Sequence, residues 1–200
     1  MAPATAVILC GGAGERLGGI DKPLRLLAGR PLIEHVLARV APQARSVLVS
    51  ANRNQERYAI YGRPLVSDGA YAGCGPLAGI AAALAAIEDA DLLCVPGDAP
   101  LLPPDLRERL DRIRRTRRAS IAYAHDGVGP QPLCCLIERG QLGALRDYLD
   151  AGGRTPREWF ARNRAVPVDC GDWPRWAWSL NTEAEWAAAE ARLARAGNPA

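Results

Sequence analysis

The chain begins with an apolar segment that runs directly into a loop crowded with glycine. Residues 6–9, Ala-Val-Ile-Leu, are apolar at every position, which is typical of a strand buried on both faces of a sheet. Glycine lets a backbone bend tightly and approach a ligand closely, and the unpaired N–H groups of such a loop bind anions. The loop holds five glycines, Gly11, Gly12, Gly14, Gly18 and Gly19. The sequence therefore predicts a strand that ends in an anion-binding loop.

Two cations accompany this loop, Arg16 within it and Lys22 just after it. Two cations on a glycine loop suit a polyanion such as a nucleoside triphosphate. Two common phosphate-binding patterns do not fit. The dinucleotide fingerprint requires glycine where Leu17 stands, and a Walker A loop requires Ser or Thr where Pro23 follows the lysine. An ordinary strand–helix turn needs only one or two glycines and no cations, so a triphosphate loop is the better interpretation.

Composition limits the class of protein. Two hundred residues with 48% hydrophobic content fit one domain with a full core, and a net charge of +3 gives no argument for nucleic acid binding. The six cysteines form no C-x-x-C pair, which favours reduced core thiols in a cytoplasmic protein. The first residues carry no charged segment of a signal peptide, and no apolar stretch has membrane-spanning length. We therefore expect no membrane association.

Strand-like runs alternate with helical patterns along the chain. Strands are expected at 46–50, 65–68 and 91–95, and helices at 31–40, 76–88 and 103–118. The second half adds strands at 120–125, 132–137 and 166–170, and helices at 142–149, 155–162 and 182–195. This alternation predicts an α/β fold, a single domain with a mostly parallel sheet and helices on both faces.

Polar side chains follow several of these strands. Ser50 and Asn52, Asp68 and Asp98 all lie at or just beyond predicted strand ends, so they should share the edge where such sheets bind ligands. Asp98, in Val-Pro-Gly-Asp-Ala-Pro, is a candidate magnesium ligand, because Mg²⁺ is held by one or two carboxylates plus substrate phosphates. The alternative is a turn or cap aspartate, and Asn52 and Asp68 carry the same alternative.

The glycine loop resembles the signature of the sugar-nucleotide-type nucleotidyltransferases, L-x-G-G-x-x-x-R-[LM]-G-x-D-K. Eight positions match: Leu9, Gly11, Gly12, Arg16, Leu17, Gly18, Asp21 and Lys22. One extra residue before Asp21 resembles the molybdenum cofactor guanylyltransferase branch. The resemblance implies a Rossmann-like nucleotide-diphospho-sugar transferase fold over residues 1–200. It implies GTP and molybdopterin cofactor as substrates, Mg²⁺ as cofactor, and molybdoenzyme maturation factors as further partners.

The same resemblance implies roles for individual residues, with the N-terminal half binding the nucleotide and the C-terminal half the acceptor. Arg16, Lys22 and Asp98 would be catalytic, with Asp98 on the metal. The nucleotide would be bound by Leu9, Cys10, Gly11, Gly12, Lys22, Ser50, Asn52, Asp68, Gly79 and Asp98, and the acceptor by Arg16, Arg154, Ser179 and Asn181.

Several residues leave alternatives open. Ser50 and Ser179 stand where the family usually has Asn, and Thr155 stands where it has an arginine, with Arg154 beside it. Asn181 is equally interpretable as part of a helix cap, since Thr182 and Glu185 have capping-box spacing. The tryptophans between 173 and 178 could stack on a pterin, although packing is the better interpretation. A cytidylyltransferase or sugar-1-phosphate nucleotidyltransferase, or a non-catalytic nucleotide-binding regulator, would also fit the glycine loop.

Overall fold

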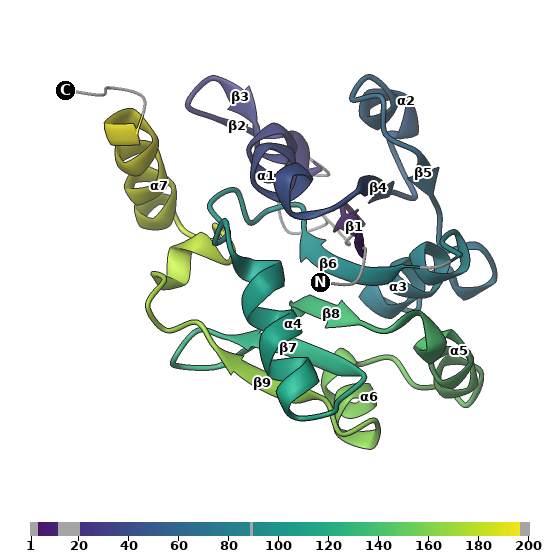
Figure 1. Ribbon diagram of the computed structural model, residues 1–200. Helices are drawn as coiled ribbons and strands as arrows, with labels where there is room; N and C mark the ends of the chain where they lie inside the picture. The colour runs from purple at the N-terminus through teal and green to yellow at the C-terminus, as the bar shows by residue number, and fades with distance from the viewer. Residues whose placement is uncertain (1–3, 12–20, 89, 197–200) are drawn as a thin grey trace.

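The computed structural model describes residues 4–11, 21–88 and 90–196. Its centre is a seven-stranded sheet (Figure 1). The strands lie in the order β5 (Leu65–Val66), β4 (Ser46–Ser50), β1 (Ala4–Leu9), β6 (Asp91–Pro96), β8 (Pro130–Ile137), β7 (Ile121–His125) and β9 (Val166–Asp169). Neighbouring strands are parallel except at β8, which is antiparallel to both β6 and β7. The predicted mostly parallel α/β sheet is confirmed, with one reversed strand.

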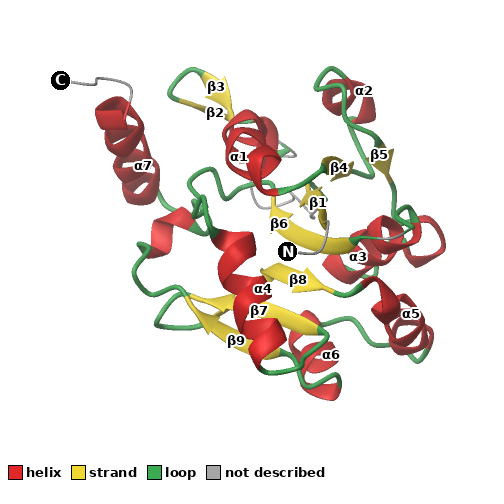
Figure 2. Ribbon diagram, in the orientation of Figure 1, coloured by secondary structure: helices red, strands yellow, loops and turns green. Residues whose placement is uncertain are grey.

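Helices cover both faces of the sheet (Figure 2). Buried residues of α1 (Leu32–Val40) and α4 (Leu106–Thr116) pack in one layer of the core. Those of α3 (Pro76–Ala85), α5 (Leu142–Asp150) and α6 (Pro156–Arg162) pack in the other. In β1, Ala6 and Ile8 belong to the first layer and Val7 and Leu9 to the second. Both faces of β1 are therefore buried, as its continuous apolar run predicts.

Two elements after the glycine loop were not predicted. β2 (Leu26–Leu27) and β3 (Arg30–Pro31) form an antiparallel hairpin joined by Ala28 and Gly29. Both linking residues have positive φ, 48° and 77°, as a tight hairpin turn requires. The usual sequence signal for such a turn is Asn-Gly or Asp-Gly, and Ala-Gly does not give it. The five-residue helix α2 (Gln55–Ala59) is similarly too short to show a helical pattern.

The C-terminal helix α7 (Glu183–Ala196) closes against this hairpin. A third apolar cluster joins Leu27 of β2 and Leu101, which follows β6, to Leu180 and Ala189 at the C-terminus. The Arg25 guanidinium lies 4.5 Å from the centre of the Trp186 ring, a cation–π contact. These contacts bring residues near 180 to the segment that follows the glycine loop. Within the described residues, no helix is long and apolar enough to cross a membrane.

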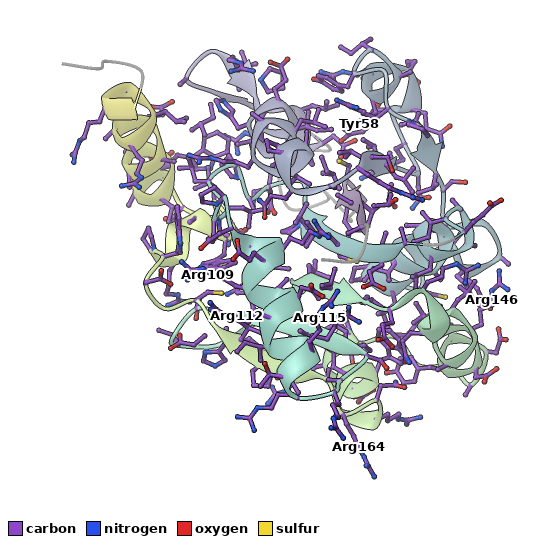
Figure 3. All side chains as sticks on the ribbon, viewed as in Figure 1. Tyr58, Arg109, Arg112, Arg115, Arg146 and Arg164 are labelled. Carbon is purple, nitrogen blue, oxygen red and sulfur yellow. The ribbon has the colours of Figure 1, made fainter. Side chains whose placement is uncertain are left out.

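An ion-pair cluster at Arg114 joins α4 to the sheet away from the carboxyl ends of its parallel strands. Arg114 is only 4% exposed, and its guanidinium donates to Asp91 (2.6 Å), Asp111 (3.1 Å) and Glu138 (2.8 Å). Burial alone would raise the pKa of the Asp111 carboxyl, but hydrogen bonds from Arg115 and Arg114 hold that pKa below its usual value. Figure 3 shows other arginines, Arg109, Arg112 and Arg115, along the same helix.

Replacing Arg114 should destabilise the fold. Arg114→Ala removes the cation from Asp91 and leaves Asp111 paired with Arg115 alone, so the free energy of unfolding should fall by about 3 kcal/mol, the lower end for breaking a buried pair. The matched control is Arg112→Ala on the exposed side of α4, for which we expect a change within about 0.5 kcal/mol. Urea unfolding of both variants measures the difference. Equal losses would show that the Arg114 cluster contributes no more than a surface residue.

Candidate functional site

The carboxyl ends of four parallel strands lie side by side at one edge of the sheet. Leu9 pairs with Ser50 on one side and with Pro96 on the other, and Ser50 pairs with Val66. Backbone hydrogen bonds continue past these ends, from the Cys10 amide to the Ser50 carbonyl (2.8 Å) and from the Gly97 amide to the Leu9 carbonyl (3.0 Å). The residues that follow each strand are thereby gathered at one edge, as predicted from their positions.

A pocket of about 450 Å³ opens at this edge, within the range of small-molecule sites. It is lined by seven of the residues singled out in the sequence, Leu9, Cys10, Gly11, Ser50, Asn52, Asp68 and Gly79. Five further residues line it, Asp21, Arg53, Gly73, Gly75 and Pro76. All twelve belong to the first 79 residues of the chain.

Gly79 brings α3 close to the strand ends. A Cβ atom at this position would lie 2.5 Å from the Ser50 Oγ atom and 3.2 Å from a Leu9 methyl carbon. The Ser50 side chain is buried, so it has little room to retreat. A larger residue at 79 would have to push the helix away from the strands, and the walls of the pocket would separate.

Asn52, which follows β4, and Asp68, which follows β5, are joined by two hydrogen bonds at this edge of the sheet. The Asn52 side-chain Nδ2 donates to the Asp68 Oδ2 at 2.6 Å, and the Asp68 backbone N–H donates to the Asn52 Oδ1 at 2.9 Å. Burial raises the pKa of the Asp68 carboxyl, and the hydrogen bond from Asn52 opposes that rise. Neither residue acts as a helix cap by its side chain, which was the alternative interpretation.

Lys22 is at the centre of a second cluster at the same edge. Its Nζ donates to Asp98 Oδ2 (2.6 Å) and Asn181 Oδ1 (2.9 Å), and lies 3.5 Å from Ser179 Oγ. Ser179 Oγ also donates to Asp98 Oδ2 at 2.9 Å. The Lys22 and Asp98 side chains are 19% and 22% exposed, so the ion pair is sheltered but reachable from solvent. Residues from both halves of the chain thus meet around one ammonium group.

Local structure fixes the two sides of this cluster. On the Asp98 side, a Cβ at Gly97 would lie 2.9 Å from the Pro23 ring and 3.0 Å from the Cys10 sulfur, so glycine allows the segment after Lys22 to pack there. On the other side, Glu185 accepts from the Asn181 and Thr182 backbone N–H groups (2.7 and 2.9 Å).

Asn181 takes part both in the cap at the start of α7 and in the Lys22 cluster. The Glu185 N–H donates to the Thr182 hydroxyl, which completes the predicted capping box. The N–H of Asn181 donates to Glu185 while its side-chain oxygen accepts from Lys22, so the residue serves both contacts.

Asp21, a buried residue of the pocket lining, is hydrogen-bonded to Asn54. Asn54 has left-handed backbone geometry, with φ 51°, and its side chain donates to the Asp21 carboxylate at 3.0 Å. Burial, with Cys10 and Asp21 nearby, raises the pKa of the Tyr58 hydroxyl, and burial and Asp21 raise that of the Cys10 thiol. Both groups are therefore neutral near pH 7, and Asp21 is held beside Lys22 by Asn54 from a different loop.

Not every predicted site residue joins these clusters. Arg154 donates to the carbonyls of Leu149 (3.0 Å) and Gly153 (2.6 Å) at the end of α5, and its own carbonyl lies near Gly75 at the pocket. Gly12 and Arg16 lie outside the described residues. Trp178 is 1% exposed in the core, which confirms packing for that tryptophan, and Trp173 is partly buried against the same cluster.

Some pocket residues were not predicted as site residues. Gly73 and Gly75 both have positive φ, 82° and 75°, and the glycine-rich stretch before α3 was a signal that could have placed them. Asp21 was noted only as part of a signature, although it lines the pocket. Arg53 follows the polar Asn52 at the end of a predicted strand and shares its loop.

The oxygen atoms around Lys22 are suitable ligands for a hard divalent cation. A carboxylate, an amide oxygen and a hydroxyl converge on one positive charge, and oxygen is the donor that Mg²⁺ prefers. In the described part of the chain, no group of three His, Cys, Asp or Glu residues could hold a metal by itself. A metal at this edge would therefore take one protein carboxylate and complete its shell from a bound phosphate.

The fold and this edge are those of a nucleotidyltransferase, with a pocket of small-molecule size beside a lysine–aspartate pair. The model of the MobA-like NTP transferase domain matches residues 6–166. The chain belongs to that family.

Curated relatives and solved structures agree with this assignment. The chain is 41% identical over 177 residues to a molybdenum cofactor guanylyltransferase of Shewanella loihica, which covers 88% of this chain and 90% of the relative. It is 41% identical over 165 residues to one of Pasteurella multocida, covering 82% and 87%.

Among solved structures, molybdopterin-guanine dinucleotide biosynthesis protein A from Archaeoglobus fulgidus superposes with a TM-score of 0.76 at 21% identity, covering 96% of this chain and 99% of that one. A cytidylyltransferase acting on 2-C-methyl-D-erythritol 4-phosphate, from Thermus thermophilus, superposes with a TM-score of 0.68 at 18% identity, covering 98% and 100%. These two likenesses establish the fold.

Lys22 should not tolerate replacement by arginine. Its compact ammonium can sit between phosphate oxygens of a bound nucleotide, where a planar guanidinium is too wide. Lys22→Arg and Lys22→Ala should both lose about 2–4 kcal/mol of transition-state stabilisation in nucleotidyl transfer. Steady-state kinetics measures the loss, and a thermal melt of each variant controls for folding. If Lys22→Arg keeps most of kcat/KM, charge alone matters and the fit of the ammonium does not.

Proposed function

We propose that the protein transfers GMP from GTP to the terminal phosphate of molybdopterin cofactor, forming the guanine dinucleotide cofactor and releasing pyrophosphate. The geometry that carries the proposal is the meeting of Lys22 and Asp98 with Ser179 and Asn181, next to a nucleotide-sized pocket. The choice of GTP and molybdopterin is supported by relatives about 40% identical over most of the chain, which carry the name molybdenum cofactor guanylyltransferase.

In this proposal the N-terminal half of the chain binds the nucleotide and the C-terminal half binds the acceptor. The pocket formed by residues 9–79 holds the nucleotide, with Cys10 and the Gly11 amide near its phosphates and Asp68 at the base. Ser179 and Asn181 face the acceptor side, and the exposed residue Arg154, whose backbone carbonyl lies near Gly75, would release its guanidinium from the Leu149 and Gly153 carbonyls to bind the acceptor phosphate. Arg16 is assigned to the phosphates from its place in the signature. The single domain spans residues 1–200, and six free cysteines support a reducing, cytoplasmic location.

The chemistry needs positioning and charge neutralisation more than a protein nucleophile. An oxygen of the acceptor phosphate attacks the α-phosphorus of GTP, and the bond from that phosphorus to the pyrophosphate oxygen breaks. Pyrophosphate leaves with the bonding electron pair. The acceptor phosphate is already an anion, so no general base is required. Lys22 leaves its contacts with Asp98 and Asn181 to neutralise the phosphates and the leaving group.

Magnesium belongs to the same proposal. Asp98 would hold it, with the Asn181 amide oxygen within reach, and the remaining ligands would be phosphate oxygens of GTP. When bound, the ion makes the α-phosphorus more electrophilic and offsets the charge of the triphosphate. Asp98, which pairs with Lys22 in the free protein, would then pair with the metal ion.

The base is tested by a turnover screen with four nucleotides and molybdopterin cofactor as acceptor. GTP should be consumed well ahead of CTP, UTP and ATP, with pyrophosphate release as the readout. A parallel screen without acceptor measures background hydrolysis. Turnover of CTP equal to or better than that of GTP would reject the guanylyl assignment and support a cytidylyltransferase. Nucleotide binding without turnover of any of the four would support a non-catalytic regulator.

Asp98 is tested by the isosteric variant Asp98→Asn. We expect kcat to fall about 10²-fold or more, because the metal loses its carboxylate while the pocket remains. Asp169→Asn is a matched control, since Asp169 also ends a strand and its carboxylate only accepts the Gly171 N–H at 2.9 Å. That control should keep its rate. A near-normal rate for Asp98→Asn at saturating Mg²⁺ would make Asp98 an ordinary turn residue.

A further inference from the structure

Asn52 lines the nucleotide pocket, yet both polar atoms of its side chain are engaged by Asp68. Its Nδ2 donates to the carboxylate and its Oδ1 accepts from the Asp68 backbone N–H. The opposite amide orientation would place two oxygens 2.6 Å apart and two donors face to face, so the network fixes which atom is which. Each of these two atoms keeps one further hydrogen-bonding position, but the contacts with Asp68 set the plane and position of the amide.

We infer that Asn52 is a specificity-determining positioning residue, which acts on the guanine base through Asp68 and not by touching the nucleotide. The inference rests on the proposed function. A carboxylate accepts hydrogen bonds only, and guanine presents two neighbouring donors, N1–H and the 2-amino group. Adenine and cytosine present one amino donor beside a ring acceptor, which would face the carboxylate unfavourably.

The contact with Asn52 fixes both the plane and the charge of the Asp68 carboxylate. With Oδ2 engaged by Asn52, the oxygen that Asn52 leaves for a base is Oδ1. The backbone contact ties Asp68, which follows β5, to the loop that follows β4. A carboxylate free to rotate or to bind a proton would accept guanine less well and would discriminate less between the bases.

The burial of Asp68 and its hydrogen bond from Asn52 give the inference a pH dependence. The other charged residues that line the pocket are Asp21, held by Asn54, and Arg53, in the loop of Asn52. Tyr71 and Cys74 are titratable groups on the loop that follows Asp68. Burial raises the pKa of Asp68 and the Asn52 hydrogen bond lowers it, so removal of the amide leaves the rise unopposed. The carboxylate is the form that binds guanine. As the pH is lowered, the Asn52 variant should therefore lose its affinity for GTP at a higher pH than the wild-type protein does.

The first experiment measures Asn52→Ala with GTP and ITP, which differ only in the 2-amino group, from about pH 4, near the ordinary carboxyl pKa, to about pH 8. We expect kcat/KM for GTP to fall about tenfold or more, mainly through KM, and the preference for GTP over ITP to shrink. The acid limb of kcat/KM should move to higher pH. Asn163→Ala is the matched control, because it removes an amide that only donates to the Trp159 carbonyl at 2.8 Å.

A double-mutant cycle separates action through Asp68 from direct contact with the base. In an Asp68→Asn background, Asn52→Ala should cost almost nothing further, and the pH dependence should already be gone. Additive losses, or an unchanged acid limb in Asn52→Ala, would overturn the inference. A wild-type enzyme without preference for GTP would instead reject the proposed function, and the inference with it. Thermal melts of each variant exclude loss of folding as the cause.

Discussion

The shared register of β4, β1 and β6 places the site residues that follow these three strands side by side. Once Leu9 is paired with Ser50 and Pro96, the residues beyond those strands must emerge side by side. The apolar character of β1 enforces this register, because a slip of one residue would exchange the two buried faces of the strand. The pocket and the Lys22 cluster are therefore consequences of strand pairing, and the loops only supply their chemistry.

The reversed strand β8 explains how the second half of the chain reaches the same edge. β8 extends the sheet by pairing antiparallel with both β6 and β7. The chain then continues through α5 and α6 to β9. The chain then returns past Trp178 to Ser179 and Asn181. The apolar cluster at Leu27, Leu180 and Ala189 holds this return segment beside the hairpin that follows Lys22. The pocket and the Ser179–Asn181 segment thus come from separate halves of the chain.

The sequence predicts the parts of this arrangement that depend on local pattern. Buried strands are evident from continuous apolar runs, and the position of Asp98 after one of them places it at the ligand edge. The capping box of Thr182 and Glu185 is likewise a local signal, and the structure confirms it. Roles assigned to Arg16 and Gly12 stay predictions, since those residues are not described.

Long-range contacts were beyond the reach of local pattern. Nothing in the chain indicates that Asn54 would donate to Asp21, or that Asn52 and Asp68 would hold each other, because those pairs meet only after the strands pair. The Ala28–Gly29 turn lacks the usual residues, and its backbone geometry is supported by the packing of Leu27. The contacts of Arg154 with the end of α5 depend in the same way on where the helix finishes.

The solitary lysine gives the protein an unusual chemical property. Apart from a terminal amine, the only primary amine in the sequence belongs to Lys22, and it is tied to Asp98 in the free protein. A reagent selective for amines therefore has one side-chain target, and its rate of reaction depends on how often the Lys22 side chain leaves the Asp98 carboxylate. The rate at which a single adduct appears by mass would report how accessible Lys22 is at the ligand edge, with no label introduced by mutation.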